Sequence, residues 1–180
     1  QSLVGSFEFN ASTSPANTYA AVNINATLSV LGVNLAVSGA ALIQVSPSIG
    51  LALDLSITVA TDQFSLVGGA FVVNGNFRLR VNTLSSQVAS IGSTTFATPI
   101  PAGPYFKLEV SNVTLGVAGV TEFTAGSMFI EVNGSTVTAA AFTVGMKIAD
   151  TPYVFGSAVF QISAAGFAIG ARIGDSDKPP

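Results

Sequence analysis

The sequence contains no cysteine and no histidine among its 180 residues. Without cysteine, the chain can form neither a disulfide framework nor a thiolate metal site. Without histidine, it lacks the commonest general base and a frequent metal ligand, which removes most hydrolytic mechanisms. The nine acidic residues share no motif of the kind that a catalytic carboxylate pair would need. We therefore predict that the chain is not an enzyme and that it holds no cofactor or metal.

Charge is also scarce. Charged residues make up 8% of the chain, against roughly 25% in a typical soluble domain, while hydrophobic residues make up 49% and the mean hydropathy is +0.62. The net charge of −3, with no basic cluster, argues against nucleic acid as a partner. No apolar run reaches the roughly 18 residues of a membrane-spanning helix, so the chain is predicted not to span a membrane. So uncharged a surface must be covered by other copies of the chain or by attached sugar.

Attached sugar has four candidate acceptors, the Asn-x-Ser/Thr triplets at Asn10, Asn25, Asn112 and Asn133. This triplet accepts N-linked glycans on surface segments of secreted proteins, although a chain rich in Asn, Ser and Thr also contains it by chance. The first residues show neither the basic nor the apolar region of a signal peptide, and Gln1 fits a processed end. An extracellular or cell-surface location is predicted, with N-linked glycans as candidate partners.

Hydrophobic and polar residues alternate along most of the chain, most clearly in 77–82 and 106–111, which is the pattern of half-buried β-strands. No window combines helical apolar spacing with caps. The sequence therefore predicts an all-β fold. Tight turns are predicted at glycine and asparagine positions, namely Gly32 to Asn34, Ser38-Gly39, Gly68-Gly69, Asn74-Gly75, Gly119, Gly126, Asn133-Gly134 and Gly156.

The sequence repeats itself with an offset of 86 or 87 residues. Three matched pairs carry the offset, namely PANTYAAV (15–22) with PAGPYFKL (101–108), NATLSVLG (25–32) with NVTLGVAG (112–119), and GAALIQV (39–45) with GSMFIEV (126–132). Two β repeats, 1–87 and 88–180, are predicted, and they can pack as one continuous domain. The irregular, proline-containing stretch from Leu84 to Pro104 is the predicted junction.

About six or seven short strands per repeat would suit antiparallel β-sandwich-like sheets, and the same regular turns would suit a β-solenoid. The clear alternation favours the sandwich. A shorter similarity links SLVGSFEFN (2–10) to SLVGGAFVVN (65–74), so the first strand has the sequence of a strand that ends a repeat. Such a strand can pair with another subunit instead of with its own chain. Its candidate assembly residues are Leu3, Val4, Phe7 and Phe9.

The run FRLRVNT (77–83), followed by IPAGPYFKLEVSNVTLGVAG (100–119) and AGSMFIEV (125–132), resembles the recurring β modules of very large bacterial surface and secreted proteins. In those arrays a similar proline, alanine, glycine, proline and aromatic signature precedes a strand with a Val-Thr-Leu-like core. The resemblance implies an extracellular, tandemly repeated, non-catalytic module, and it carries over no functional residues.

Two functions follow as expectations. The first is an extracellular structural subunit that self-assembles into a surface layer or filament, with strand exchange through the N-terminal strand as one route, because unprotected sheet edges template pairing and few charges block it here. The alternative is an adhesin or carbohydrate-binding module, which would be monomeric and would present a concave polar patch with stacked tyrosines.

Overall fold

The computed structural model describes residues 2–30, 33–59, 71–117, 120–149 and 151–174, and all of their regular structure is β-strand. The strands are β1 (Ser2–Ser14), β2 (Asn17–Val30), β3 (Val33–Gln44), β4 (Gly50–Val59), β5 (Phe71–Asn82), β6 (Val88–Ile91), β7 (Thr94–Ile100), β8 (Tyr105–Val117), β9 (Thr121–Asn133), β10 (Thr136–Ile148), β11 (Thr151–Ser163) and β12 (Gly166–Gly174). The all-β prediction is confirmed. Within these residues, no helix is long and apolar enough to cross a membrane.

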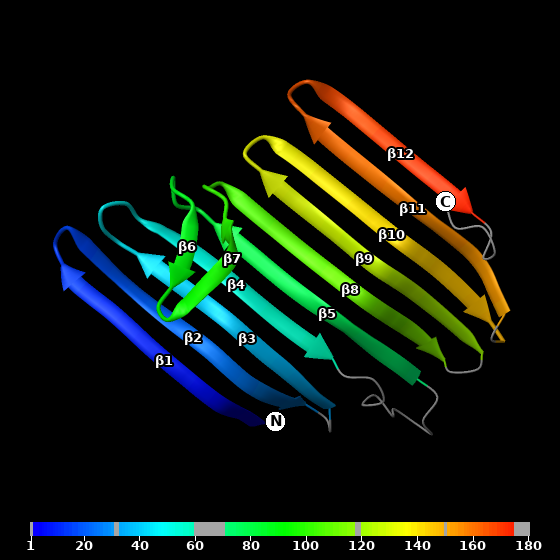
Figure 1. The fold of residues 1–180 in the computed structure, drawn as a ribbon, viewed down its shortest axis with the longest axis horizontal. Coiled ribbons are helices and arrows are strands. Elements are labelled where there is room, and N and C mark those ends of the chain that lie inside the picture. The colour runs from blue at the N-terminus through cyan, green and yellow to red at the C-terminus, as the bar shows by residue number, and fades with distance from the viewer. Residues whose placement is uncertain (1, 31–32, 60–70, 118–119, 150, 175–180) are drawn as a thin grey trace.

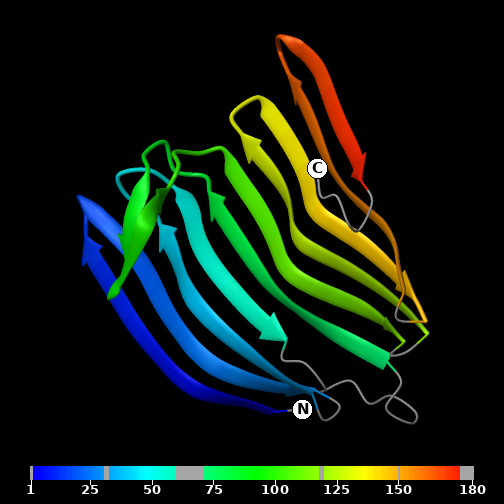
Figure 2. The same cartoon turned by 45° about the vertical axis from the view of Figure 1, so that its right-hand side comes forward.

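Ten strands form one antiparallel sheet in the order β1-β2-β3-β4-β5-β8-β9-β10-β11-β12 (Figure 1). Each strand pairs with the next one along the chain, except that the β6–β7 hairpin is looped out between β5 and β8. The sheet twists and bends as a whole, and the hairpin lies across one end of one face (Figure 2). Among the described residues, this hairpin is the only second layer over the sheet, and a single antiparallel meander is not the coil of a solenoid.

The duplicated segments occupy equivalent places in the meander. β2 and β3 of the first repeat correspond to β8 and β9 of the second, in the same order. β5 pairs with β8 along its length, so the two repeats continue as one sheet. The predicted boundary at residue 87 falls between β5 and β6.

The strands of the large sheet are longer than the predicted short ones, at 9 to 14 residues. The turn at Asn133-Gly134 is confirmed, whereas Ser38-Gly39, Asn74-Gly75, Gly126 and Gly156 lie inside strands. Those four predictions are wrong because a strand glycine can also mark a bulge or a close backbone approach. The pairing of β5 with β8 shifts register at Gly75, for example. Gly32, Gly68-Gly69 and Gly119 lie outside the described residues.

Gly39 shows the close approach. It lies in β3 beside β4 with a φ of 145°, and a Cβ atom built there would collide with the carbonyl oxygen of Asp54. Only glycine lets the two strands come this close without strain. The glycine therefore serves the sheet and does not end the strand.

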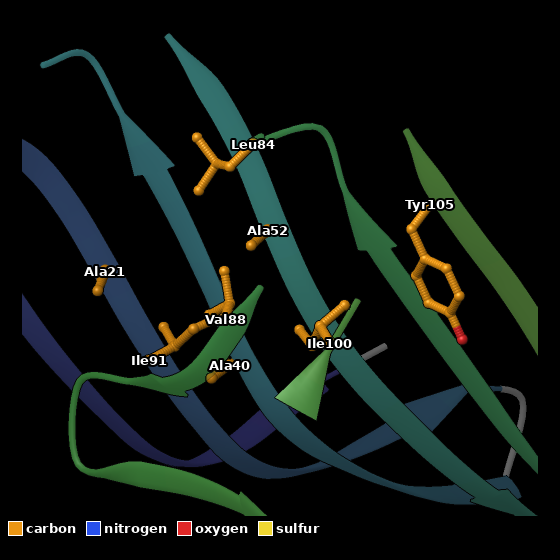
Figure 3. Packing of buried hydrophobic residues seen from close by; sticks show 8 residues of the cluster. All are labelled: Ala21, Ala40, Ala52, Leu84, Val88, Ile91, Ile100 and Tyr105. Atoms are coloured by element: carbon orange, nitrogen blue, oxygen red, sulfur yellow. The ribbon is translucent and has the colours of Figure 1, made fainter. Parts of the chain in front are cut away.

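The buried core lies between the hairpin and the sheet, and the two strands of the hairpin replace the irregular structure predicted for 84–104. Alanines on three neighbouring strands let the hairpin sit close to the sheet, and larger apolar side chains from the hairpin and its flanks fill the space above them (Figure 3). The cluster consists of Ala21, Ala40, Ala52, Leu84, Val88, Ile91, Ile100 and Tyr105.

The base of the hairpin is fastened by the fully buried Asn82. Its side-chain amide donates hydrogen bonds to the backbone oxygens of Ser86 (2.8 Å) and Pro101 (2.7 Å). Its side-chain oxygen accepts a bond from the backbone N–H of Leu84 (2.9 Å). Gly103, within the PAGPY signature, donates its N–H to the Leu84 oxygen (2.6 Å). The signature thus closes the loop that carries the hairpin.

Candidate assembly surfaces and a polar groove

The two faces of the ten-stranded sheet differ in chemistry. Successive side chains of a strand point to opposite faces, so the cross-strand register assigns each residue to one of them. The hairpin lies on the face that we call the polar face. One of its rows of paired positions reads, from β1 to β12, Glu8, Asn23, Ala40, Asp54, Arg80, Lys107, Glu131, Thr138, Gln161 and Ala168.

The opposite face, which we call the apolar face, carries three neighbouring rows that run across all ten strands. The first is Phe9, Val22, Ala41, Leu53, Val81, Phe106, Val132, Val137, Ile162 and Phe167; the second is Phe7, Ile24, Gly39, Leu55, Leu79, Leu108, Ile130, Ala139, Phe160 and Ile169; the third is Gly5, Ala26, Val37, Ile57, Phe77, Val110, Met128, Ala141, Ala158 and Ala171. Every position holds a hydrophobic residue or glycine.

No described segment covers the apolar face, because the hairpin packs on the other side. Phe9 is 78% exposed, Ile169 70% and Phe167 62%. With strands about 4.8 Å apart and rows about 6.8 Å apart, the three rows span roughly 1,000 Å². An exposed apolar patch beyond a few hundred Å² marks an interaction surface. The apolar face is therefore the largest candidate contact surface of the described chain.

The predicted assembly strand β1 is paired with β2 from Ser2 to Ser14, and this pairing uses one of its two edges. Leu3, Phe7 and Phe9 lie on the apolar face, and Val4 lies on the polar face. β1 and β12 end the sheet, so the outer edge of each has no strand partner among the described residues. The part of β1 that is available for pairing with another subunit is thus its outer edge, because the strand itself is already paired with β2.

A polar groove of about 550 Å³ lies where the hairpin overhangs the sheet, lined by Glu8, Asn23, Asp54, Arg78, Ser93 and Phe96 among others. Beyond it, a second hollow of about 610 Å³ extends over β8 to β10 toward Phe129 and Phe142. Arg78 lines both.

Two charged residues of this groove, Arg78 and Asp54, are paired with each other. Arg78 binds the buried Asp54 through two hydrogen bonds, Nε to Oδ1 (2.8 Å) and Nη2 to Oδ2 (2.6 Å). These bonds to Asp54 raise the pKa of Arg78. Arg80 lies 3.4 Å from the same carboxylate and donates to the backbone oxygen of Thr98 (2.8 Å). In the described part of the chain, no three His, Cys, Asp or Glu residues come together as metal ligands would.

The two tyrosines whose side chains are described do not form a platform at this groove. Tyr105 is buried, and burial together with the adjacent Glu131 raises its pKa to about 12. Tyr19 is half-buried against the core and donates its hydroxyl to the side-chain oxygen of Asn10 (3.1 Å). The side chain of Tyr153 lies outside the described residues. The described tyrosines are structural.

All four glycan acceptor candidates are exposed, and none of them belongs to the three apolar rows. Asn10, Asn25 and Asn133 are on the polar face by register, and Asn133 adjoins the turn to β10. Asn112 has a φ of 53° within β8. Sugar on Asn10, Asn25 and Asn133 would leave the apolar face free.

Comparison of the chain with protein-family models, with curated proteins and with solved structures gives no match. The resemblance to bacterial surface modules thus stays a prediction. Sequence reasoning singled out β1 and missed the apolar rows, which involve all ten strands. Alternation within each strand was the available signal, but only the register joins the strands into rows.

Proposed function

We propose that the chain is a non-catalytic, extracellular structural subunit that joins further copies edge to edge into a filament or surface layer. The observation that carries this proposal is the pair of open edges, β1 and β12. An antiparallel meander with an even number of strands has edges that run in opposite directions. A second copy placed beside β12 in the same orientation therefore brings its β1 antiparallel to β12, and the meander continues across the junction.

The side chains support this junction. If the apolar rows continue in register, Phe167 lies next to Phe9 of the next copy, and Ile169 lies next to Phe7. Such aromatic and aliphatic cross-strand pairs stabilise sheets. Neither edge strand contains the proline or lysine residues that commonly protect an edge; β1 carries one charge, on Glu8, and β12 carries one, on Arg172. These two charges have opposite signs.

The extracellular location is supported by the four exposed acceptor asparagines. Glycans on the polar face would add hydration where the protein supplies few charges. Intact-mass measurement of the protein from its natural source tests this part, and an unmodified mass would count against glycosylation.

Proline substitutions in β1 test edge-to-edge growth. The backbone N–H groups of strand residues an odd number of positions apart point to opposite edges, so one of Ser6→Pro and Ala11→Pro removes an N–H from the outer edge without touching the β1–β2 bonds. That variant should keep its strand content by circular dichroism and should form no filaments by negative-stain electron microscopy. Ser6→Ala is the control and should assemble like the wild type. Normal filaments from both proline variants would sink the proposal.

A carbohydrate-binding module is the second candidate, favoured by the polar groove of about 550 Å³ beside the hairpin. Serine, asparagine and arginine side chains there can hydrogen-bond sugar hydroxyls, with Phe96 as the apolar surface. On a glycan array, wild-type protein should bind and Arg78→Ala should bind more weakly. An array without hits would remove this candidate.

A further inference from the structure

We infer that the apolar face is covered by the apolar face of a second copy of the chain, so that two sheets form a sandwich. This contact uses a different surface from the edges β1 and β12 and does not require edge-to-edge growth. The sequence predicts a sandwich-like fold, yet each chain supplies one large sheet and a small hairpin. The missing layer is supplied by the second copy.

The chemistry of the three rows selects an apolar partner. No row position is charged or polar, so a partner that presents charged side chains would have to bury them without counter-charges, which is costly. In a two-fold interface the same patch meets itself, and like charges facing each other would oppose pairing. The three apolar rows contain no charged residue. A second copy meets these requirements without any further component.

The area is sufficient for a stable contact. The rows cover roughly 1,000 Å² on each copy, so face-to-face packing removes roughly 2,000 Å² in total from water. Stable protein interfaces bury about 1,200 to 2,000 Å², and obligate homodimers bury more. Residues outside the rows, such as Leu3 and Ile43, lie on the same face and are exposed, so they enlarge the contact.

The apolar face also has hollows and protruding side chains, as the inner faces of interdigitating sheets do. Near β10 to β12, a hollow of about 280 Å³ is formed by Ala139, Ala141 and Ala158 and rimmed by Met128, Phe160 and Ile169. On β1, at the far side of the sheet, Phe7 and Phe9 protrude. Large side chains of one copy can thus fill hollows of the other, as inner faces of packed sheets do.

Size measurement of the outer-edge proline variant tests this inference, because that variant cannot grow through β1. It should sediment as a dimer, at twice the monomer mass of 18.1 kDa. Adding Ile130→Lys, at an apolar-face position that is 42% exposed, should give monomers, with the dissociation constant raised at least about a hundredfold. Gln161→Lys, at an exposed position of the polar face, is the matched control and should leave the dimer intact.

A second matched pair guards against a folding defect. Ile57→Lys introduces the charge on the apolar face, and Thr58→Lys introduces it at the next residue of β4, on the polar face. Circular dichroism should show the same strand content in all four variants. Only the two apolar-face variants should be monomeric.

Three results would overturn the inference: a monomeric proline variant, dimers that tolerate both apolar-face lysines, or a monomer that binds phosphatidylcholine vesicles through this face. If the wild type forms no filaments, the wild type itself should be the dimer. Failure of edge growth and failure of face pairing are therefore distinguishable.

Discussion

Replacing Asn82 with alanine should destabilise the fold far more than the same replacement of Asn76, another asparagine of β5. Asn82 is fully buried and makes three hydrogen bonds, two donated by its amide and one accepted by its oxygen. All three partners are backbone groups at the base of the β6–β7 hairpin. Alanine would therefore loosen the loop that holds the buried core over the sheet.

The magnitude follows from those three bonds. Each contributes about 1 kcal/mol net, and a buried partner left unsatisfied costs about 1 to 3 kcal/mol. Ser86 is exposed, so water can reach its carbonyl, whereas Leu84 is buried and its N–H would stay unsatisfied. The expected loss is about 3 to 4 kcal/mol. With a urea m-value of about 2 kcal/mol/M, the midpoint should fall by about 1.5 to 2 M.

Urea unfolding followed by far-ultraviolet circular dichroism measures this loss, at one fixed protein concentration. Asn76→Ala is the control, because Asn76 lies in the same strand and on the same face but is only half-buried, and it accepts a bond from Thr58 (2.9 Å). Its expected cost is about 1 kcal/mol. If Asn82→Ala lowers the midpoint no further than this control does, then Asn82 does not fasten the hairpin.

Two further predictions concern the buried charges and the buried phenol. Asp54→Ala should cost about 3 to 5 kcal/mol, because it leaves the buried Arg80 without its carboxylate; urea unfolding measures it, and the double variant Asp54→Ala with Arg80→Met should recover part of the loss. Tyr105, with a pKa raised to about 12, stays protonated when folded while the unfolded phenol ionises near its ordinary value of 10. Stability should therefore fall as the pH rises from about 10 to 12, by roughly 3 kcal/mol at most. In Tyr105→Phe this alkaline loss of stability should be absent. An identical dependence of stability on pH in the two proteins would contradict the prediction.

The strand pattern could be predicted from sequence because alternation is a local property. Phe106, Leu108 and Val110 show their common face without any knowledge of their neighbours. The interior glycines could not be interpreted in the same way. Gly39 looks like a turn residue, but its role is set by the Asp54 carbonyl on β4, which no local pattern reveals.

The hairpin escaped prediction for a related reason. β6 and β7 are short, and prolines and serines surround them, so their local sequence favours irregular structure. They are held instead by tertiary packing, since Val88, Ile91 and Ile100 are buried against alanines of the sheet. Tertiary contacts of this kind override weak local propensities.

The scarcity of charge also has a spatial explanation that composition alone does not give. In the rows that cross all ten strands, charges such as Glu8, Asp54 and Lys107 are confined to the polar face, while the apolar face has none. If charges were equally scarce on both faces of the sheet, both faces would be poorly hydrated. This chain instead has one ordinary wet face and one face with the composition of a protein interior. Pairing two apolar faces would leave only polar faces and sheet edges in contact with water, and assembly through the edges would then extend a structure that is already two layers thick.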